Sequence, residues 1–172
     1  AAANLGAQTY NLQIRAINLN PDNDVYHASY SQTNLALADA LAGQANLTDQ
    51  QKSTVISLVQ QAIREARTAA ALNPNRASDW ENLAVIYRSL INFAQGADQW
   101  TVASMNQAIA LNPTNPQLRL DLGGLYFTAK DYNTAGQLFS QAVSLKQDFA
   151  NAHYNLDQAY KALAVKGQAL TG

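Results

Sequence analysis

The chain has 172 residues, of which 48% are hydrophobic, enough for one domain with a sizeable core. Only 13% are charged, the formal net charge is −1 and no run of Lys or Arg occurs, so we expect no binding to nucleic acid. Cysteine is absent, which excludes disulfides, thiolate nucleophiles and cysteine-bound metals. No apolar run reaches the roughly 18 to 20 residues of a membrane-spanning helix, so we expect a soluble segment without direct membrane insertion.

The first part of the chain predicts three helices. Residues 4–19 have apolar side chains near helical spacing, and an Asn-Pro pair ends the pattern. A second helix is expected over residues 24–42, closed by a glycine. Thr48 and Gln51 have the spacing of a capping box, so a third helix should cover residues 49–72. At about 1.5 Å per residue this helix would be roughly 36 Å long, and we expect the second and third helices to project at the loop that joins them.

The rest of the chain predicts two further helix pairs and a last helix. Residues 77–115 hold a first helix around Trp80 and a second helix for which Asp98 is the expected N-cap. The most regular pair lies within residues 116–147. Gly123 falls where its two helices come closest, so we expect the missing side chain to have a packing reason.

One motif recurs in three of the expected helices: a leading residue, then a leucine, a place that is small in two of the three copies, and a tyrosine. Its copies are Trp80-x-x-Leu83-Ala84-x-x-Tyr87, Arg119-x-x-Leu122-Gly123-x-x-Tyr126 and His153-x-x-Leu156-Asp157-x-x-Tyr160. Leu-Asn-Pro precedes the motif at residues 72–74 and 111–113, and the last copies follow each other at about 34 residues. This pattern resembles the tetratricopeptide repeat (TPR). The segment over residues 22–72 departs most from it, because its motif places hold His27, Tyr30, Ser31 and Asn34.

The resemblance implies an all-α fold, a TPR-like right-handed superhelix (α-solenoid) of antiparallel helix pairs. It covers almost the whole chain, as a single TPR domain over residues 1–172. Its expected parts are a leading helix (4–21), a long divergent helix pair (22–76), a repeat (77–115), a second repeat (116–149) and a truncated repeat (150–172). The chain begins with three alanines, has its one methionine at Met105 and ends within a repeat. We therefore expect a piece of a larger, bacterial-type protein, with a membrane anchor outside it as one option.

TPR domains mostly bind other proteins, so the resemblance implies a non-catalytic protein–protein interaction module that holds a peptide or helix of a partner in the concave groove. In this family the positions one, five and eight places after the leading residue tend to face that groove. Here they are Glu81, Val85, Arg88, Leu120, Gly124, Phe127, Tyr154, Gln158 and Lys161. Leu120, Phe127 and Tyr154 would form an apolar centre around a dent at Gly124, flanked by the positive charges of Arg88 and Lys161. The same apolar side chains could instead pack against the next helix.

A structural role is the alternative reading. The chain is similar in general style to the TPR tails of multi-spanning bacterial membrane proteins, including polysaccharide polymerase-like and ligase-like proteins. It would then be a spacer or assembly domain, and self-association stays open. An apolar patch on the helix pair of residues 22–72 would favour this role.

We predict that the chain is not an enzyme and needs no cofactor, because the sequence displays no nucleophile–base or acid–base pair. His27 and His153 occupy leading motif places, where a packing role is expected in preference to a metal site. Asp24 and Asp79 stand at helix starts, where the helix dipole favours carboxylates. Glu81 stands where carboxylate-gripping TPR co-chaperones carry Lys or Asn, so we do not expect an acidic C-terminal tail in the groove.

Overall fold

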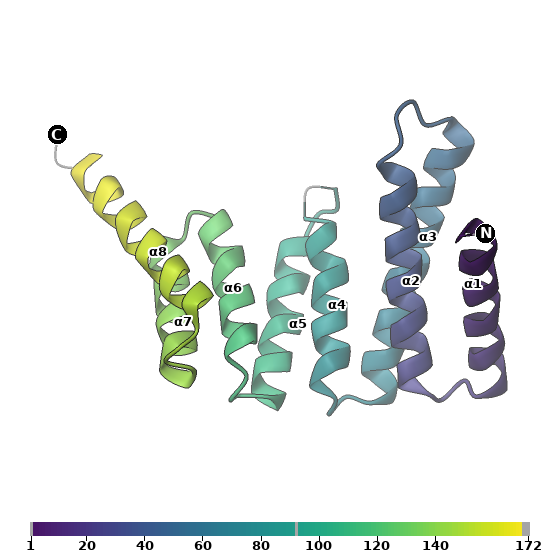
Figure 1. Cartoon of the computed structure of the whole chain (residues 1–172), viewed down its shortest axis with the longest axis horizontal. Coiled ribbons are helices and arrows are strands. Elements are labelled where there is room, and N and C mark those ends of the chain that lie inside the picture. The colour runs from purple at the N-terminus through teal and green to yellow at the C-terminus, as the bar shows by residue number, and fades with distance from the viewer. Residues whose placement is uncertain (1, 92, 170–172) are drawn as a thin grey trace. The chain divides into compact units, whose positions relative to one another are not determined.

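The computed structural model describes residues 2–91 and 93–169, and within them every regular element is an α-helix (Figure 1). The elements are α1 (Ala2–Leu19), α2 (Asp24–Ala42), α3 (Asp49–Leu72), α4 (Ala77–Ser89), α5 (Ala97–Leu111), α6 (Pro116–Thr128), α7 (Tyr132–Leu145) and α8 (Ala150–Ala169). This confirms the predicted all-α fold. α5 begins at Ala97, so Asp98 lies inside its first turn and the expectation that it is the N-cap is wrong.

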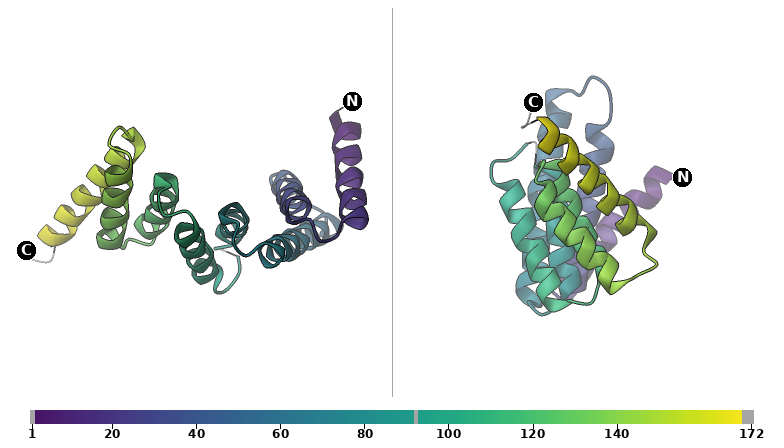
Figure 2. Two further views of the ribbon diagram at one scale, coloured as in Figure 1. Left: turned by 90° about the horizontal axis from the view of Figure 1, so that it is seen from below. Right: turned by 90° about the vertical axis from the view of Figure 1, so that its left-hand side faces the viewer.

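The helices group into two compact units, Ala1–Ala108 and Ile109–Gly172, and the boundary falls within α5. In the first unit α3 packs against α2 and α4, and α1 packs against α2. In the second unit α7 packs against both α6 and α8, and Figure 2 shows α7 and α8 lying against each other. The single domain over residues 1–172 and its division into repeats remain predictions.

Local signals set where the helices begin. At the start of α3, the Gln51 backbone N–H donates to Thr48 Oγ1 at 3.2 Å and the Thr48 backbone N–H donates to Gln51 Oε1 at 2.9 Å. This is the predicted capping box. α3 has 24 residues, and Figure 1 shows the α2–α3 loop extending past the ends of α1 and α4. Asn115 caps α6, which opens on Pro116, because the Gln117 backbone N–H donates to its side-chain oxygen at 3.0 Å.

The same type of hydrogen bond occurs in four loops, and we call it the loop clamp. In each, a side-chain N–H at the leading motif place donates to the backbone oxygen six residues earlier. The pairs are His27 Nε2 with Pro21 O (2.8 Å), Trp80 Nε1 with Pro74 O (2.9 Å), Arg119 Nη1 with Pro113 O (2.6 Å) and His153 Nε2 with Gln147 O (2.8 Å). A carbonyl oxygen only accepts, so both histidines carry the proton on Nε2. His27 is buried, whereas His153 is exposed, so the packing role expected of both histidines is wrong for His153.

Each unit has its own core. In the first unit, alanines of α3 that include Ala62 and Ala66 pack with Leu83 and Ile86 of α4. In the second unit the fully buried ring of Phe139 on α7 is the largest core side chain. These two cores hold the side chains of α3, α4, α6 and α8 in the positions from which the candidate sites are built.

The neighbouring glycines of α6 have opposite surroundings. A Cβ at Gly123 would lie 2.5 Å from Phe139 Cε1, closer than non-bonded carbons approach. A Cβ at Gly124 would meet nothing within 4 Å. Gly123 therefore permits the contact between α6 and α7, as predicted, whereas Gly124 faces open space.

We expect Gly123→Ala to destabilise the protein by about 1 to 3 kcal/mol, because the buried Phe139 ring must move to admit the methyl group. Gly124→Ala is the matched control. It should stabilise the protein by about 0.5 to 1 kcal/mol, because alanine has the higher helix propensity and meets no neighbour there. Urea unfolding followed by circular dichroism measures both changes. Equal effects of the two substitutions would contradict the close approach of α6 and α7.

Candidate functional site

The predicted groove residues of α4 reach solvent. Val85 is 43% exposed, Arg88 is exposed and Glu81 is half-buried. No ion pair to Arg88 is found in the described part of the chain. These three residues of α4 all lie in the first unit.

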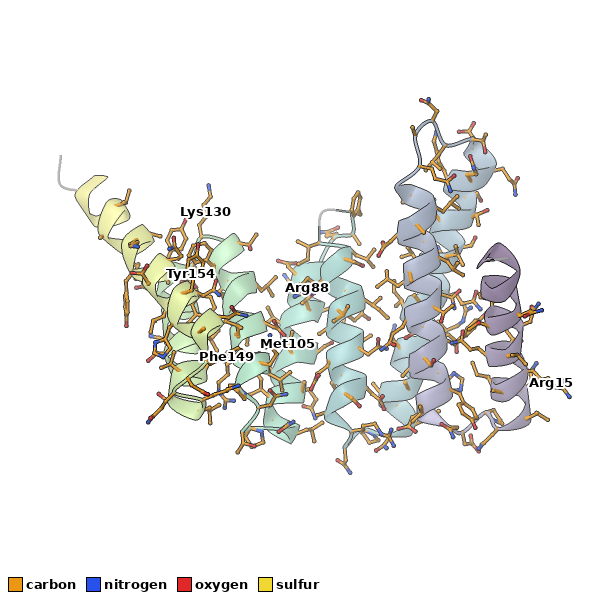
Figure 3. All side chains as sticks on the ribbon, in the orientation of Figure 1. Arg15, Arg88, Met105, Lys130, Phe149 and Tyr154 are labelled. Atoms are coloured by element: carbon orange, nitrogen blue, oxygen red, sulfur yellow. The ribbon has the colours of Figure 1, made fainter. Side chains whose placement is uncertain are left out.

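The predicted groove residues of α6 and α8 divide between core and surface. Leu120 is only 8% exposed and belongs to the core of the second unit, which corrects its expected exposure. Phe127 is half-buried, with its ring edge-on to Tyr132 at 5.1 Å between centroids. Tyr154 is 65% exposed (Figure 3), and Gly124 lies open. The open apolar surface here is therefore smaller than predicted, because the α6–α7–α8 packing uses Leu120 and part of Phe127.

The positive charge expected at Lys161 is balanced. Its Nζ lies 2.6 Å from Asp157 Oδ2, and this contact raises the pKa of Lys161. Both side chains are more than half exposed, so the pair adds little to stability. Gln158 is half-buried beside Asp157, and the three residues give this end of the α6–α8 surface a polar edge.

A second candidate site, which the sequence reasoning missed, lies on the first unit. α3, α4 and α5 enclose an open pocket of about 510 Å³, which we call the Trp pocket. Its lining residues are Arg67, Ala70, Ala71, Pro74, Trp80, Leu83, Tyr87, Trp100, Ala103, Ser104 and Gln107. Tyr87 and Trp100 stack with ring centroids 6.0 Å apart, and Trp100 is 59% exposed. The sequence contained one indication of this site, its two tryptophans, because both of them line the pocket.

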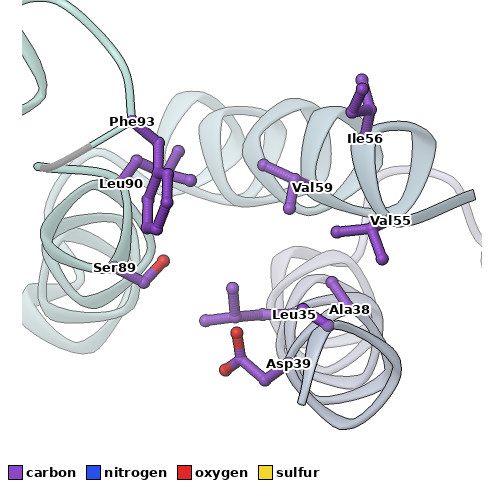
Figure 4. Close-up of a pocket in the computed structure, with 10 residues that line it drawn as sticks. Leu35, Ala38, Asp39, Val55, Ile56, Val59, Ser89, Leu90 and Phe93 are labelled. Atoms are coloured by element: carbon purple, nitrogen blue, oxygen red, sulfur yellow. The ribbon is translucent and has the colours of Figure 1, made fainter. Parts of the chain in front are cut away.

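A third candidate site lies at the projecting end of α2 and α3 and is drawn in Figure 4. This hairpin-end pocket has a volume of about 270 Å³. Its lining residues are Leu35, Ala38, Asp39, Ala42, Val55, Ile56, Val59, Ser89, Leu90 and Phe93. Phe93 is 85% exposed and Ile56 is 58% exposed, so an apolar patch is present on the helix pair of residues 22–72 and the loop after α4.

The structure also brings together two carboxyl groups that the sequence reasoning treated separately. Asp24 at the start of α2 and Asp79 at the start of α4 are both buried and share a hydrogen bond. Burial raises the pKa of Asp79 to about 6, and the hydrogen bond to Asp24 and its negative charge add to the shift. Burial opposes ionisation of Asp24 as well, but hydrogen bonds from Asn73 (2.9 Å) and Asp79 and the charge of Arg76 (2.8 Å) lower its pKa.

This carboxyl pair is a structural junction. A carboxyl pair with divergent pKa values is typical of acid–base catalysis. Here Asp79 is 2% exposed and Asp24 is 9% exposed, and neither lines any of the cavities described above. Arg76 and Asn73 satisfy Asp24 from the loop between α3 and α4, so the pair joins three segments of the first unit.

Two further properties of the described residues bear on function. No group of three His, Asp or Glu side chains there is placed to hold a metal ion. None of the helices, over the same residues, combines the length and apolar character needed to cross a membrane.

Asp79 predicts an unusual pH dependence of stability. Its pKa is about 6 in the folded state against an ordinary value of 3.8, so the folded state binds the extra proton between these values. Raising the pH from 4.5 to 7 should therefore remove stability, by at most about 3 kcal/mol. Asp79→Asn keeps a donor to Asp24 and cannot ionise, so its free energy of unfolding should change less over this range.

Urea unfolding at several pH values measures this dependence, with the exposed Asp148→Asn as control. The control should lose stability with pH as the wild-type protein does. If the wild-type protein instead gains stability between pH 4.5 and 7, or if Asp79→Asn follows the wild-type curve, Asp79 is not the group that titrates.

The comparisons with known proteins identify the fold. Residues 101–156 match the family model described as tetratricopeptide repeat. No curated protein matches the sequence. The chain is similar to the crystal structure of MamA protein, with 16% identity, a TM-score of 0.71 and coverage of 99% of this chain and 80% of that one. It is also similar to TTC0263, a thermophilic TPR protein of Thermus thermophilus, with 19% identity, a TM-score of 0.69 and coverage of 92% and 75%. The helix pairs, the motif and these likenesses agree: residues 101–156 match the tetratricopeptide repeat, and the chain has the fold of the tetratricopeptide repeat proteins it resembles.

Proposed function

We propose that the chain is a non-catalytic protein–protein interaction module that binds a peptide or helix of a partner protein on the first helices of its repeats. The TPR fold is a scaffold for protein interactions, which supports the general role. The observation that carries the finer proposal is the open space at Gly124 on α6, in a unit where α8 exposes Tyr154.

The second unit offers what an extended peptide needs. A glycine with no neighbour within 4 Å lets a ligand backbone come close to α6. Tyr154 supplies an aromatic anchor with a polar hydroxyl, the kind of side chain enriched at binding hot spots. The Asp157–Lys161 pair and Gln158 form a polar edge beside it. In the first unit, Val85 and Arg88 would be the residues of α4 that contact a bound peptide.

The test is a selection of peptides of about twelve residues from a random displayed library on the wild-type chain. For the peptides bound on α6 and α8, Tyr154→Ala and Gly124→Leu should each raise Kd about tenfold or more, because they remove the anchor and fill the dent. Tyr160→Ala is the matched control, since Tyr160 is also exposed on α8, at 58%. If no selected peptide depends on Tyr154 or Gly124, this surface is not the binding site.

The hairpin-end pocket favours a second candidate function, assembly with a second copy of the chain. The patch carries both an apolar pocket and the protruding Phe93 ring, so two copies related by a twofold axis could each insert Phe93 into the other. Asp39 is the one charged residue among those lining the pocket, and the patch is otherwise suited to a dry contact.

Sedimentation equilibrium tests the assembly. We expect a wild-type dimer whose dissociation constant rises about tenfold or more in Phe93→Asp, because the substitution would bury an unpaired charge. Val25→Asp is the control, since Val25 is 46% exposed at the opposite end of α2. A wild-type chain that stays monomeric to about 100 µM would rule out a physiologically strong dimer.

A further inference from the structure

The Trp pocket brings together the side chains that dominate protein interfaces. Its walls include Trp80, Tyr87, Trp100 and Arg67, and Trp, Tyr and Arg are the residues most enriched at binding hot spots. Leu83 and Ala70 also line the pocket and are themselves buried. The volume of about 510 Å³ lies within the range of pockets that hold ligand-sized groups.

The aromatic walls are held in place before any ligand arrives. Trp80 is fixed by the loop clamp to Pro74 O at 2.9 Å. Trp100 stacks on Tyr87, and its indole lies 3.8 Å from the Cβ position of Gly96, whose φ of 77° turns the chain into α5. Such preorganised rings lose little conformational entropy when a partner side chain inserts between them. Yet Trp100 remains 59% exposed, so the pocket leaves apolar surface uncovered.

The charge beside the pocket is positive. Arg67 lines one wall, and no ion pair to it is found among the described residues. The outer face of α3 continues from there as a shallow depression of about 520 Å³ that Arg64 and Arg67 both line. Arg64 lies 3.5 Å from Glu65 Oε1, which leaves Arg67 as the available cation. No carboxylate lines either cavity in the part of the chain described, so the site is complementary to a negative charge next to an apolar group.

We propose that the Trp pocket binds an acidic segment of a partner protein, which inserts an aromatic or long aliphatic side chain beside Trp80 and Trp100 and pairs a neighbouring carboxylate with Arg67. The segment continues along α3 over Arg64. This site is distinct from the surface of α6 and α8 in the proposed function, and it adds a preference for charge that the TPR fold alone does not specify.

The same displayed library tests this site. Peptides that bind the Trp pocket should combine an aromatic or aliphatic residue with Asp or Glu in adjacent positions. Synthetic copies of the selected sequences should change the intrinsic tryptophan fluorescence saturably, because both tryptophans of the chain line the pocket. Arg67→Glu should raise their Kd about tenfold or more, and Trp100→Ala should do likewise.

Arg15→Glu is the charge-matched control, since Arg15 is exposed on α1 (Figure 3), and it should leave Kd within about twofold. Unfolding curves of Trp100→Ala show whether the half-exposed ring was needed for folding. Peptides that bind equally well to Arg67→Glu, or a selected consensus that is neutral or basic, would overturn the proposal. If Tyr154→Ala raises the Kd of the selected peptides and Trp100→Ala does not, the proposed function is supported and this inference is overturned. The test therefore distinguishes failure of this inference from failure of the proposed function.

Discussion

The loop clamp is the contact that ties the start of α2, α4, α6 and α8 to the loop before each of these helices. Each of these loops leads from one helix into the next: α1 into α2, α3 into α4, α5 into α6 and α7 into α8. A side-chain N–H from the new helix reaches back six residues to the loop carbonyl, which fixes that helix relative to the loop. The small residue of the motif then stands one turn further along, and at Gly123 the approach of the next helix leaves no room for a Cβ. On α6 the clamp and the close contact are therefore one helical turn apart.

The clamp also explains why such different residues share one place. Trp80, Arg119 and His153 differ in charge, shape and burial, but each carries an N–H at the end of a long or planar side chain. The N–H donor is what this role requires, and an aromatic ring is not necessary for it. Arg119 even makes a second hydrogen bond, from Nε to Gln141 Oε1 at 3.2 Å, and so reaches α7. The leading place is better described as a donor site than as an aromatic site.

The sequence predicted the helices, the capping box of α3 and the role of Gly123, because these depend on short stretches of the chain with distinctive residues. It predicted the fold from the motif for the same reason. It did not predict the Trp pocket, which needs side chains from three helices, nor the carboxyl pair of Asp24 and Asp79, whose members meet only when α4 packs beside α2. The burial of Leu120 likewise depends on how α6, α7 and α8 pack together, which helical spacing alone does not determine.

The buried alanines of α3 affect how α3 is aligned along its neighbouring helices in the first unit. Alanines have no rotamers and make shallow ridges, so Ala62 and Ala66 allow close approach without strongly opposing a slide of one helix along another. Polar contacts from the same helix resist that slide. Gln61 Nε2 donates to Tyr30 Oη at 2.7 Å, and Glu65 Oε2 lies 2.7 Å from His27 Nδ1. A shift by one turn would leave these groups buried without partners, so hydrogen bonds specify the register of α3 against α2, while the alanines allow close packing with α4.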